Sequence, residues 1–75
     1  MTYSADNIYY VLFPTTRSFI RAHHLVEESG IKHRVVSVPD HLSSECGMSL
    51  QITGNQCDSI TNILREAQIN FEIQS

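Results

Sequence analysis

The sequence has little positive charge and no long apolar run. It contains five lysine and arginine residues against eight acidic ones, for a formal net charge of −3. The basic residues are scattered singly, whereas nucleic-acid modules carry basic patches, so we expect no nucleic-acid partner. No apolar run approaches the roughly eighteen residues that a membrane span needs. The first residues also lack the charged and apolar segments of a signal peptide. We therefore expect a cytoplasmic protein that is not inserted in a membrane.

Cysteine is scarce, with Cys46 and Cys57 as the two thiols of the chain. Without a secretion signal, two cysteines indicate reduced thiols rather than a disulfide framework. Seventy-five residues allow a single domain over 1–75, and a chain this short buries only roughly 60% of its unfolded surface. We expect a small core that self-association, for example as a homodimer, would help to stabilise. Residues 1–7 are polar and are expected to be frayed.

Hydrophobic periodicity predicts alternating strands and helices. Apolar or alternating stretches at 8–13, 33–38, 48–52 and 70–73 are typical of strands. A helix is predicted from about Thr16 to Ser29, with Thr15 or Thr16 as its cap and Gly30 after its end. A second helix follows the 53–55 turn. Its apolar stripe consists of Cys57, Ile60, Ile63, Leu64 and Ala67.

This order predicts an α+β, ferredoxin-like βαββαβ fold, with two helices on one face of a four-stranded antiparallel sheet. Right-handed connections leave a gap between the first two strands, and the third strand fills it. The end of the first strand, the start of the first helix and the turn after the second strand then share one end of the domain. The turn 43–47 should therefore face 14–17.

That turn, Ser-Ser-Glu-Cys-Gly, contains the main candidate site residue, Cys46. Its polar, glycine-ended composition predicts an accessible thiol, and Gly47 permits close approach of another molecule. If the extended backbone begins at Cys46, this residue shares a face with Met48 and lies at the rim of the helical side. The alternative is that Cys46 is a small apolar residue filling a turn.

The surroundings of the turn suggest how a thiolate would be stabilised. The start of the first helix presents unpaired backbone N–H groups, which favour an anion. We therefore name Thr15, Thr16, Arg17 and Gly47 as anion-stabilising candidates, although Thr15 and Thr16 are also ordinary capping residues. His41 could stabilise or generate the thiolate as imidazolium or as base.

No chemical role is expected for the remaining cysteine or for the remaining histidines. Cys57 lies on the apolar stripe, at the opposite end of the domain from Cys46, and is predicted to be core. Among the histidines, His23 is expected to be half-buried, and His24 and His33 to be solvated. No C-x-x-C or H-x-x-x-H pair is present, so the sequence predicts neither a metal site nor a cofactor site.

Several of these residues resemble a known family, described as putative selenium/sulfur carrier-like proteins. The resemblance covers roughly 9–71 and rests on Leu-Phe-Pro-Thr-Thr at 12–16, Val-Pro at 38–39 and the Ser-Ser-x-Cys-Gly turn at 43–47. It implies that Cys46 is a carrier thiol with Gly47 as its companion. The chain departs from the family at His23 and His24, where acidic and basic residues are usual, and at Asp40, where a basic residue is usual.

The sequence therefore predicts a sulfur or selenium carrier, not an independent enzyme. The thiolate of Cys46 would receive the atom from a donor enzyme as a persulfide or selenosulfide and pass it to an acceptor enzyme. The main alternative is a small regulatory or interaction module that self-associates through the exposed edge strand 33–38. A third is a metal-binding chaperone that uses Cys46.

Overall fold

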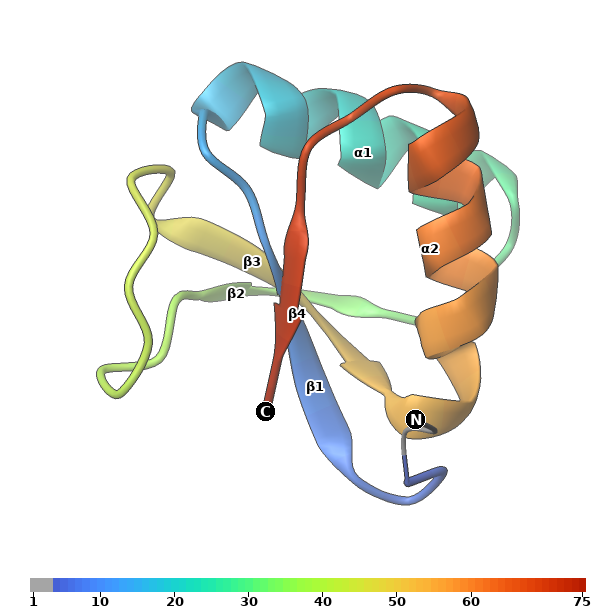
Figure 1. The fold of residues 1–75 in the computed structure, drawn as a ribbon, viewed down its shortest axis with the longest axis horizontal. Coiled ribbons are helices and arrows are strands. Elements are labelled where there is room, and N and C mark those ends of the chain that lie inside the picture. Colours follow the sequence, from blue (N-terminus) through green and yellow to red (C-terminus); the bar gives the residue numbers. More distant parts are fainter. Residues whose placement is uncertain (1–3) are drawn as a thin grey trace.

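The chain folds into a sheet with helices packed against it (Figure 1). This computed structural model describes residues 4–75. In chain order its elements are β1 (Ile8–Leu12), α1 (Thr16–Glu28), β2 (Arg34–Ser37), β3 (Met48–Thr53), the 3-10 turn η1 (Gly54–Gln56), α2 (Cys57–Glu66) and β4 (Glu72–Gln74). None of the helices within 4–75 is long and apolar enough to cross a membrane.

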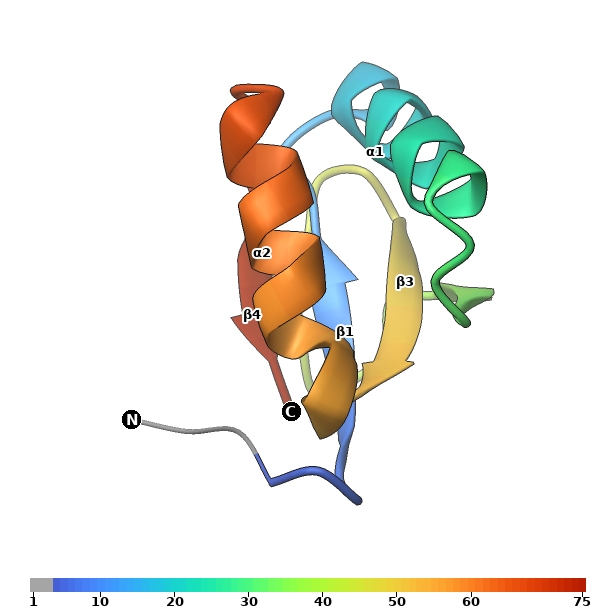
Figure 2. The same cartoon turned by 90° about the vertical axis from the view of Figure 1, so that its right-hand side faces the viewer.

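The sheet has four strands in the order β2-β3-β1-β4. Each neighbouring pair is antiparallel, and Leu50 of β3 is the register partner of both Val11 on β1 and Val35 on β2. The third strand therefore lies between the first two, as the split connection predicted. Both helices lie on the same face of the sheet (Figure 2). The predicted α+β class, with an antiparallel four-stranded sheet and two helices, is confirmed.

The strand bounds differ from the predicted ones at their ends. The first strand ends one residue early, so Phe13 lies outside it, yet its side chain is buried in the core. The second strand omits His33 and Val38. The last begins only at Glu72. Phe13 packs in the core and Phe71 packs against it, although both lie outside the strands, and periodicity alone does not distinguish such packing from a strand.

Local sequence signals define the helices. The Thr15 side chain caps α1 by accepting a hydrogen bond from the Ser18 N–H at 3.0 Å. After the helix, Gly30 adopts a φ of +73°, a conformation that glycine reaches without steric cost. At the next helical start, Thr53 and Gln56 form a reciprocal capping box. These caps fix where each helix begins and ends.

The core lies between the sheet and the two helices. Val11 and Leu50 from the sheet are fully buried, as are Val26, Ile60 and Leu64 from the helices. Ile60 and Leu64 belong to the apolar stripe that the periodicity predicted for the second helix. One face of the sheet and the two helices thus form one hydrophobic cluster. Cys46 lies at the edge of this cluster, in the connection between β2 and β3.

The described residues before β1 form a turn that rests on the start of η1. The N–H of Asn7 donates to the Ser4 carbonyl at 3.1 Å, and the N–H of Gly54 donates to the Asn7 carbonyl at 3.0 Å. A Cβ on Gly54 would collide with the Ser4 backbone, so only glycine fits there. The expected fraying of 1–7 stays a prediction, because 1–3 lie outside the described residues.

Candidate functional site

The turn that contains Cys46 belongs to the connection between β2 and β3. This connection and the start of α1 lie on the same side of the molecule (Figure 1). The hydroxyl of Ser44 donates to the Phe13 carbonyl at 2.6 Å, which ties the turn to the end of β1. The two segments are 31 residues apart in sequence. The strand order therefore brings the turn to the end of the sheet where it was expected.

Ser44 also organises the turn internally. Its hydroxyl oxygen accepts from the Cys46 N–H at 3.3 Å, and its carbonyl accepts from the Gly47 N–H at 3.3 Å. Gly47 has a φ of +79°, which a side chain would strain, and its carbonyl accepts from Val38 N–H at 3.1 Å. The sequence analysis did not single out Ser44, because a serine in a polar loop carries no signal of a distant partner.

Cys46 itself is half-buried and unpaired. Its side chain packs against the hydrophobic core, as does that of Met48 two residues later. Cys46 therefore lies at the rim of the helical face, as predicted. The extended backbone does not begin at Cys46, however, because Gly47 has a positive φ and β3 begins only at Met48. The position is fixed by the Cys46 N–H, which donates to the Ser44 hydroxyl, and by the Gly47 N–H, which donates to the Ser44 carbonyl.

The start of α1 retains its positive character. The helix itself offers no acceptor to the first-turn amides of Thr16 and Arg17, and the first turn has no acidic residue to neutralise them. The Arg17 side chain is exposed and forms no ion pair within residues 4–75. No hydrogen bond among the described residues joins Cys46 to this helix start. The anion-stabilising roles of Thr15, Thr16, Arg17 and Gly47 therefore stay predictions.

A surface hollow of about 570 Å³ lies beside the turn. Its walls come from the end of β1, the turn and the segment that leads into β4. The lining residues are Leu12, Phe13, Pro14, Ser43, Ser44, Glu45, Asn70, Phe71 and Glu72. Cys46 borders these residues in sequence without lining the hollow, so the hollow is a surface next to the thiol and not a pocket around it.

His41 lies against β1 and the residue that follows β4. Its Nε2 is 3.1 Å from the Ser75 carbonyl oxygen, and its ring meets Tyr10 edge-on with 6.5 Å between centroids. None of its hydrogen bonds within 4–75 reaches the turn around Cys46. The action of His41 on the thiol stays a prediction.

Cys57 is a core residue, as predicted. Its side chain is 0% exposed, and its Sγ is 3.9 Å from the Thr53 carbonyl, at the opposite end of β3 from Cys46. Burial raises the pKa of the Cys57 thiol, and the nearby negative charge of Asp58 adds to the effect. A buried, protonated thiol is a poor nucleophile. Neither cysteine forms a disulfide.

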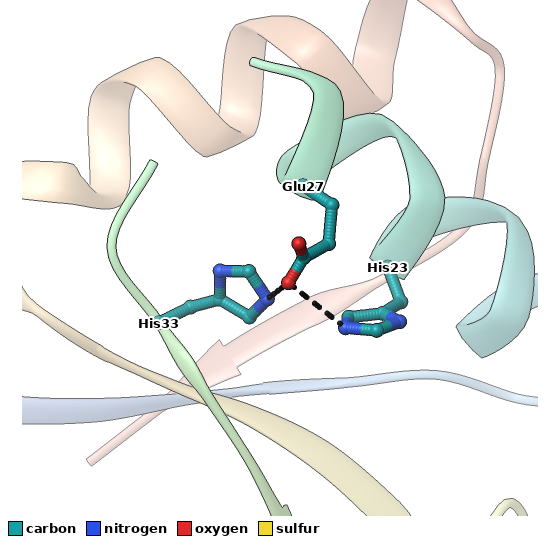
Figure 3. Close-up of side chains that lie close together, drawn as sticks. All are labelled: His23, Glu27 and His33. Carbon is teal, nitrogen blue, oxygen red and sulfur yellow. Dashed lines mark ion pairs between the residues drawn. The ribbon is translucent and has the colours of Figure 1, made fainter. Parts of the chain in front are cut away.

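A second cluster lies at the other end of α1, where Glu27 faces two histidines (Figure 3). The Oε1 atom of Glu27 is 3.6 Å from His23 Nε2 and 3.4 Å from His33 Nε2. His23 is half-buried and His24 is exposed, as expected. His33 was expected to be solvated, and this was wrong. Its side chain is only 6% exposed, because the segment before β2 lies under the end of α1.

The cluster has no cysteine pair and no H-x-x-x-H pair to mark it in the sequence. The carboxylate of Glu27 stands four residues after His23, one helical turn away, so the pair shares a face of α1. A search for His-x-x-x-Glu would have found it. His33 has no local signal, since it joins the cluster only through the fold.

The chain was compared with family models, curated proteins and solved structures. Over residues 8–73, the chain matches the model of the family described as "Putative Se/S carrier protein-like". The chain belongs to this family. The match includes both helices and the turn around Cys46, and its description concerns the family as a whole without assigning a role to any residue. No curated protein and no solved structure matches the chain.

Proposed function

We propose that this member of the Se/S carrier-like family is a sulfur or selenium carrier and not an independent enzyme. The atom would be held on Cys46. The observation that carries the proposal is the half-buried thiol on a turn that Ser44 fixes to the end of β1. The family description supports the same class of function. The buried position of Cys57 leaves Cys46 as the thiol within reach of a partner.

The proposed chemistry is transfer of one sulfane sulfur atom between thiols. The thiolate of Cys46 attacks the terminal sulfur of a donor enzyme's cysteine persulfide. A new S–S bond forms at Cys46, the donor's S–S bond breaks, and the donor leaves as a thiolate. A selenosulfide is formed in the same way when the donor's terminal atom is selenium. A nucleophile on an acceptor enzyme then removes the atom and returns the Cys46 thiolate, with no external oxidant or reductant.

Three features of the surroundings suit this chemistry. The start of α1 favours an anion, and the exposed Arg17 adds a cation at that end. The hollow bordered by Ser43 and Glu45 offers a surface on which a donor or acceptor could dock. The proposal keeps Thr15, Thr16 and Gly47 as anion-stabilising groups, and His41 as a modulator of the thiol.

The proposal also covers the topology and the cellular compartment. The βαββαβ order with β3 inserted between β1 and β2 is the arrangement expected of a ferredoxin-like domain. We propose the cytosol as the compartment, because its thiol pools keep unpaired cysteines reduced. The decisive experiment is incubation with a cysteine desulfurase and cysteine, followed by intact mass measurement of wild type and Cys46→Ser.

The runner-up function is an interaction module that self-associates. One observation favours it: β2 is an edge strand, and its Val35 is 41% exposed. Open backbone groups on an edge strand invite pairing with a second chain. Sedimentation of wild type and Val35→Lys tests this candidate. A wild-type dimer that the lysine dissociates would support it, and a monomer at every concentration would reject it.

A further inference from the structure

We propose that His23, Glu27 and His33 form a binding site for a divalent transition-metal ion, with zinc as the expected metal. The three residues join the end of α1 to the segment before β2, and their side chains converge (Figure 3). Two imidazole nitrogens and one carboxylate oxygen form a donor set known from zinc sites. This site is separate from Cys46 and independent of the carrier function.

The tautomer of His33 is the first argument for a metal site. Its Nδ1 lies 2.7 Å from the carbonyl oxygen of Ile31, and a carbonyl can only accept. Nδ1 therefore carries a hydrogen, and in neutral imidazole the lone pair is on Nε2. Metal-ligating histidines commonly donate their other ring N–H to a carbonyl in this way, which fixes the ring and its tautomer. The backbone thus holds His33 ready to ligate.

The close approach of His33 and Glu27 is the second argument. A neutral Nε2 and a carboxylate oxygen both present lone pairs, yet they lie only 3.4 Å apart. Positive charge between the two atoms, either a proton on Nε2 or a metal ion, would make this approach attractive. The His33 side chain is 6% exposed and that of Glu27 is 61% exposed, so an ion would reach the pair from the Glu27 side.

The donor spacing is the third argument. In a tetrahedral site with metal–ligand distances of about 2.0–2.2 Å, neighbouring donors are about 3.4 Å apart. The two distances from Glu27 Oε1, 3.4 Å to His33 and 3.6 Å to His23, already match this edge. All three donor atoms lie within 4.8 Å of one another. The remaining edge joins the ring nitrogens of His23 and His33, and a small shift of the half-buried His23 ring would close it.

The positions of the other two ligands explain how an ion would enter. The ring of His23 stacks on Phe19 with 6.0 Å between centroids, which restrains its orientation. The side chain of Glu27 is 61% exposed, so the cluster is open to solvent on that side. Three protein ligands leave a fourth position for water or for an exogenous ligand.

Zinc titration of the purified chain tests the site, with calorimetry for affinity and stoichiometry. We expect one ion per chain, with a dissociation constant in the micromolar range or tighter. Glu27→Gln and His23→Gln should each weaken binding roughly tenfold or more, because each removes one of three ligands. His24→Gln is the matched control: it neighbours His23 on the same helix, is exposed, and should bind as wild type does.

Cobalt(II) provides a second readout that distinguishes this site from a thiolate site. The bound ion should show visible d–d absorption without a sulfur-to-metal charge-transfer band, and Cys46→Ser should leave the spectrum unchanged. His33 is left intact, since its replacement would remove core packing as well as a ligand. Equal zinc affinity in wild type, His23→Gln and Glu27→Gln would overturn the proposal, as would loss of the ion in Cys46→Ser.

Discussion

The two cysteines should differ sharply in their reaction with an alkylating reagent. Cys46 is half-buried on a surface turn, whereas Cys57 is 0% exposed on the buried face of α2. A reagent can reach the latter only when the core opens. In the native protein Cys46 should therefore react first, and the second label should appear at the rate of unfolding or opening.

The size of the difference follows from the expected stability. A chain of this length has an unfolding free energy of about 4–11 kcal/mol, from typical values per residue. Even about 4 kcal/mol would slow labelling of a core thiol roughly a thousandfold relative to the unfolded chain. Burial also raises the Cys57 pKa, which lowers its thiolate fraction further. Cys46 should be slowed by about tenfold or less, because no global opening is needed.

Time-resolved mass spectrometry after iodoacetamide addition measures both rates, with peptide mapping to assign each label. The control is the same reaction in concentrated urea, where the two thiols should react at similar rates. Replacement of Cys57 by serine should cost about 1–3 kcal/mol, because Sγ is already 3.9 Å from the Thr53 carbonyl and a hydroxyl there would lack a close acceptor. Native labelling that reaches Cys57 first would refute the helix register and the assignment of the carrier thiol.

Two further predictions concern the turn and the buried thiol. Ser44→Ala removes the hydroxyl bonds to Phe13 and Cys46, so it should lower the unfolding free energy by about 1–3 kcal/mol and speed Cys46 labelling. Urea titration and labelling measure these two effects. The control is Ser43→Ala, whose serine is exposed and which should behave as wild type does. Because burial raises the Cys57 pKa above the ordinary 9.0, the stability from its protonated thiol is fully present below pH 9.0 and is lost as pH rises through the higher folded value. Between about pH 8 and about pH 10, the urea midpoint should fall further in wild type than in Cys57→Ala. Equal falls in the two proteins would contradict the raised pKa of Cys57.

Hydrophobic periodicity and capping residues predicted the features that depend on residues close together in sequence. The helical stripe placed Cys57 in the core, and the cap at Thr15 marked the start of α1. The order of elements was enough to place β3 between its neighbours, because a split connection leaves only that position. The placement of the Cys46 turn at the end of β1 followed from the same order.

Contacts between distant segments could not be predicted in this way. The Ser44 hydroxyl meets a carbonyl 31 residues earlier, and nothing in the loop sequence encodes that partner. His33 was assigned to solvent, since its burial comes from the path of the chain beneath α1. His41 was considered for its proximity to Cys46 in sequence, whereas its contacts are with Tyr10 and Ser75.

The most direct test of the carrier account is sulfur uptake by the native protein. Wild type, Cys46→Ser and Cys57→Ala are each incubated with a cysteine desulfurase and cysteine, and intact mass is recorded before and after reduction. The account predicts that wild type and Cys57→Ala gain one sulfur atom, that the reductant removes it, and that Cys46→Ser gains none. A wild type that gains no sulfur, or a Cys46→Ser variant that gains as much as wild type, would contradict the account.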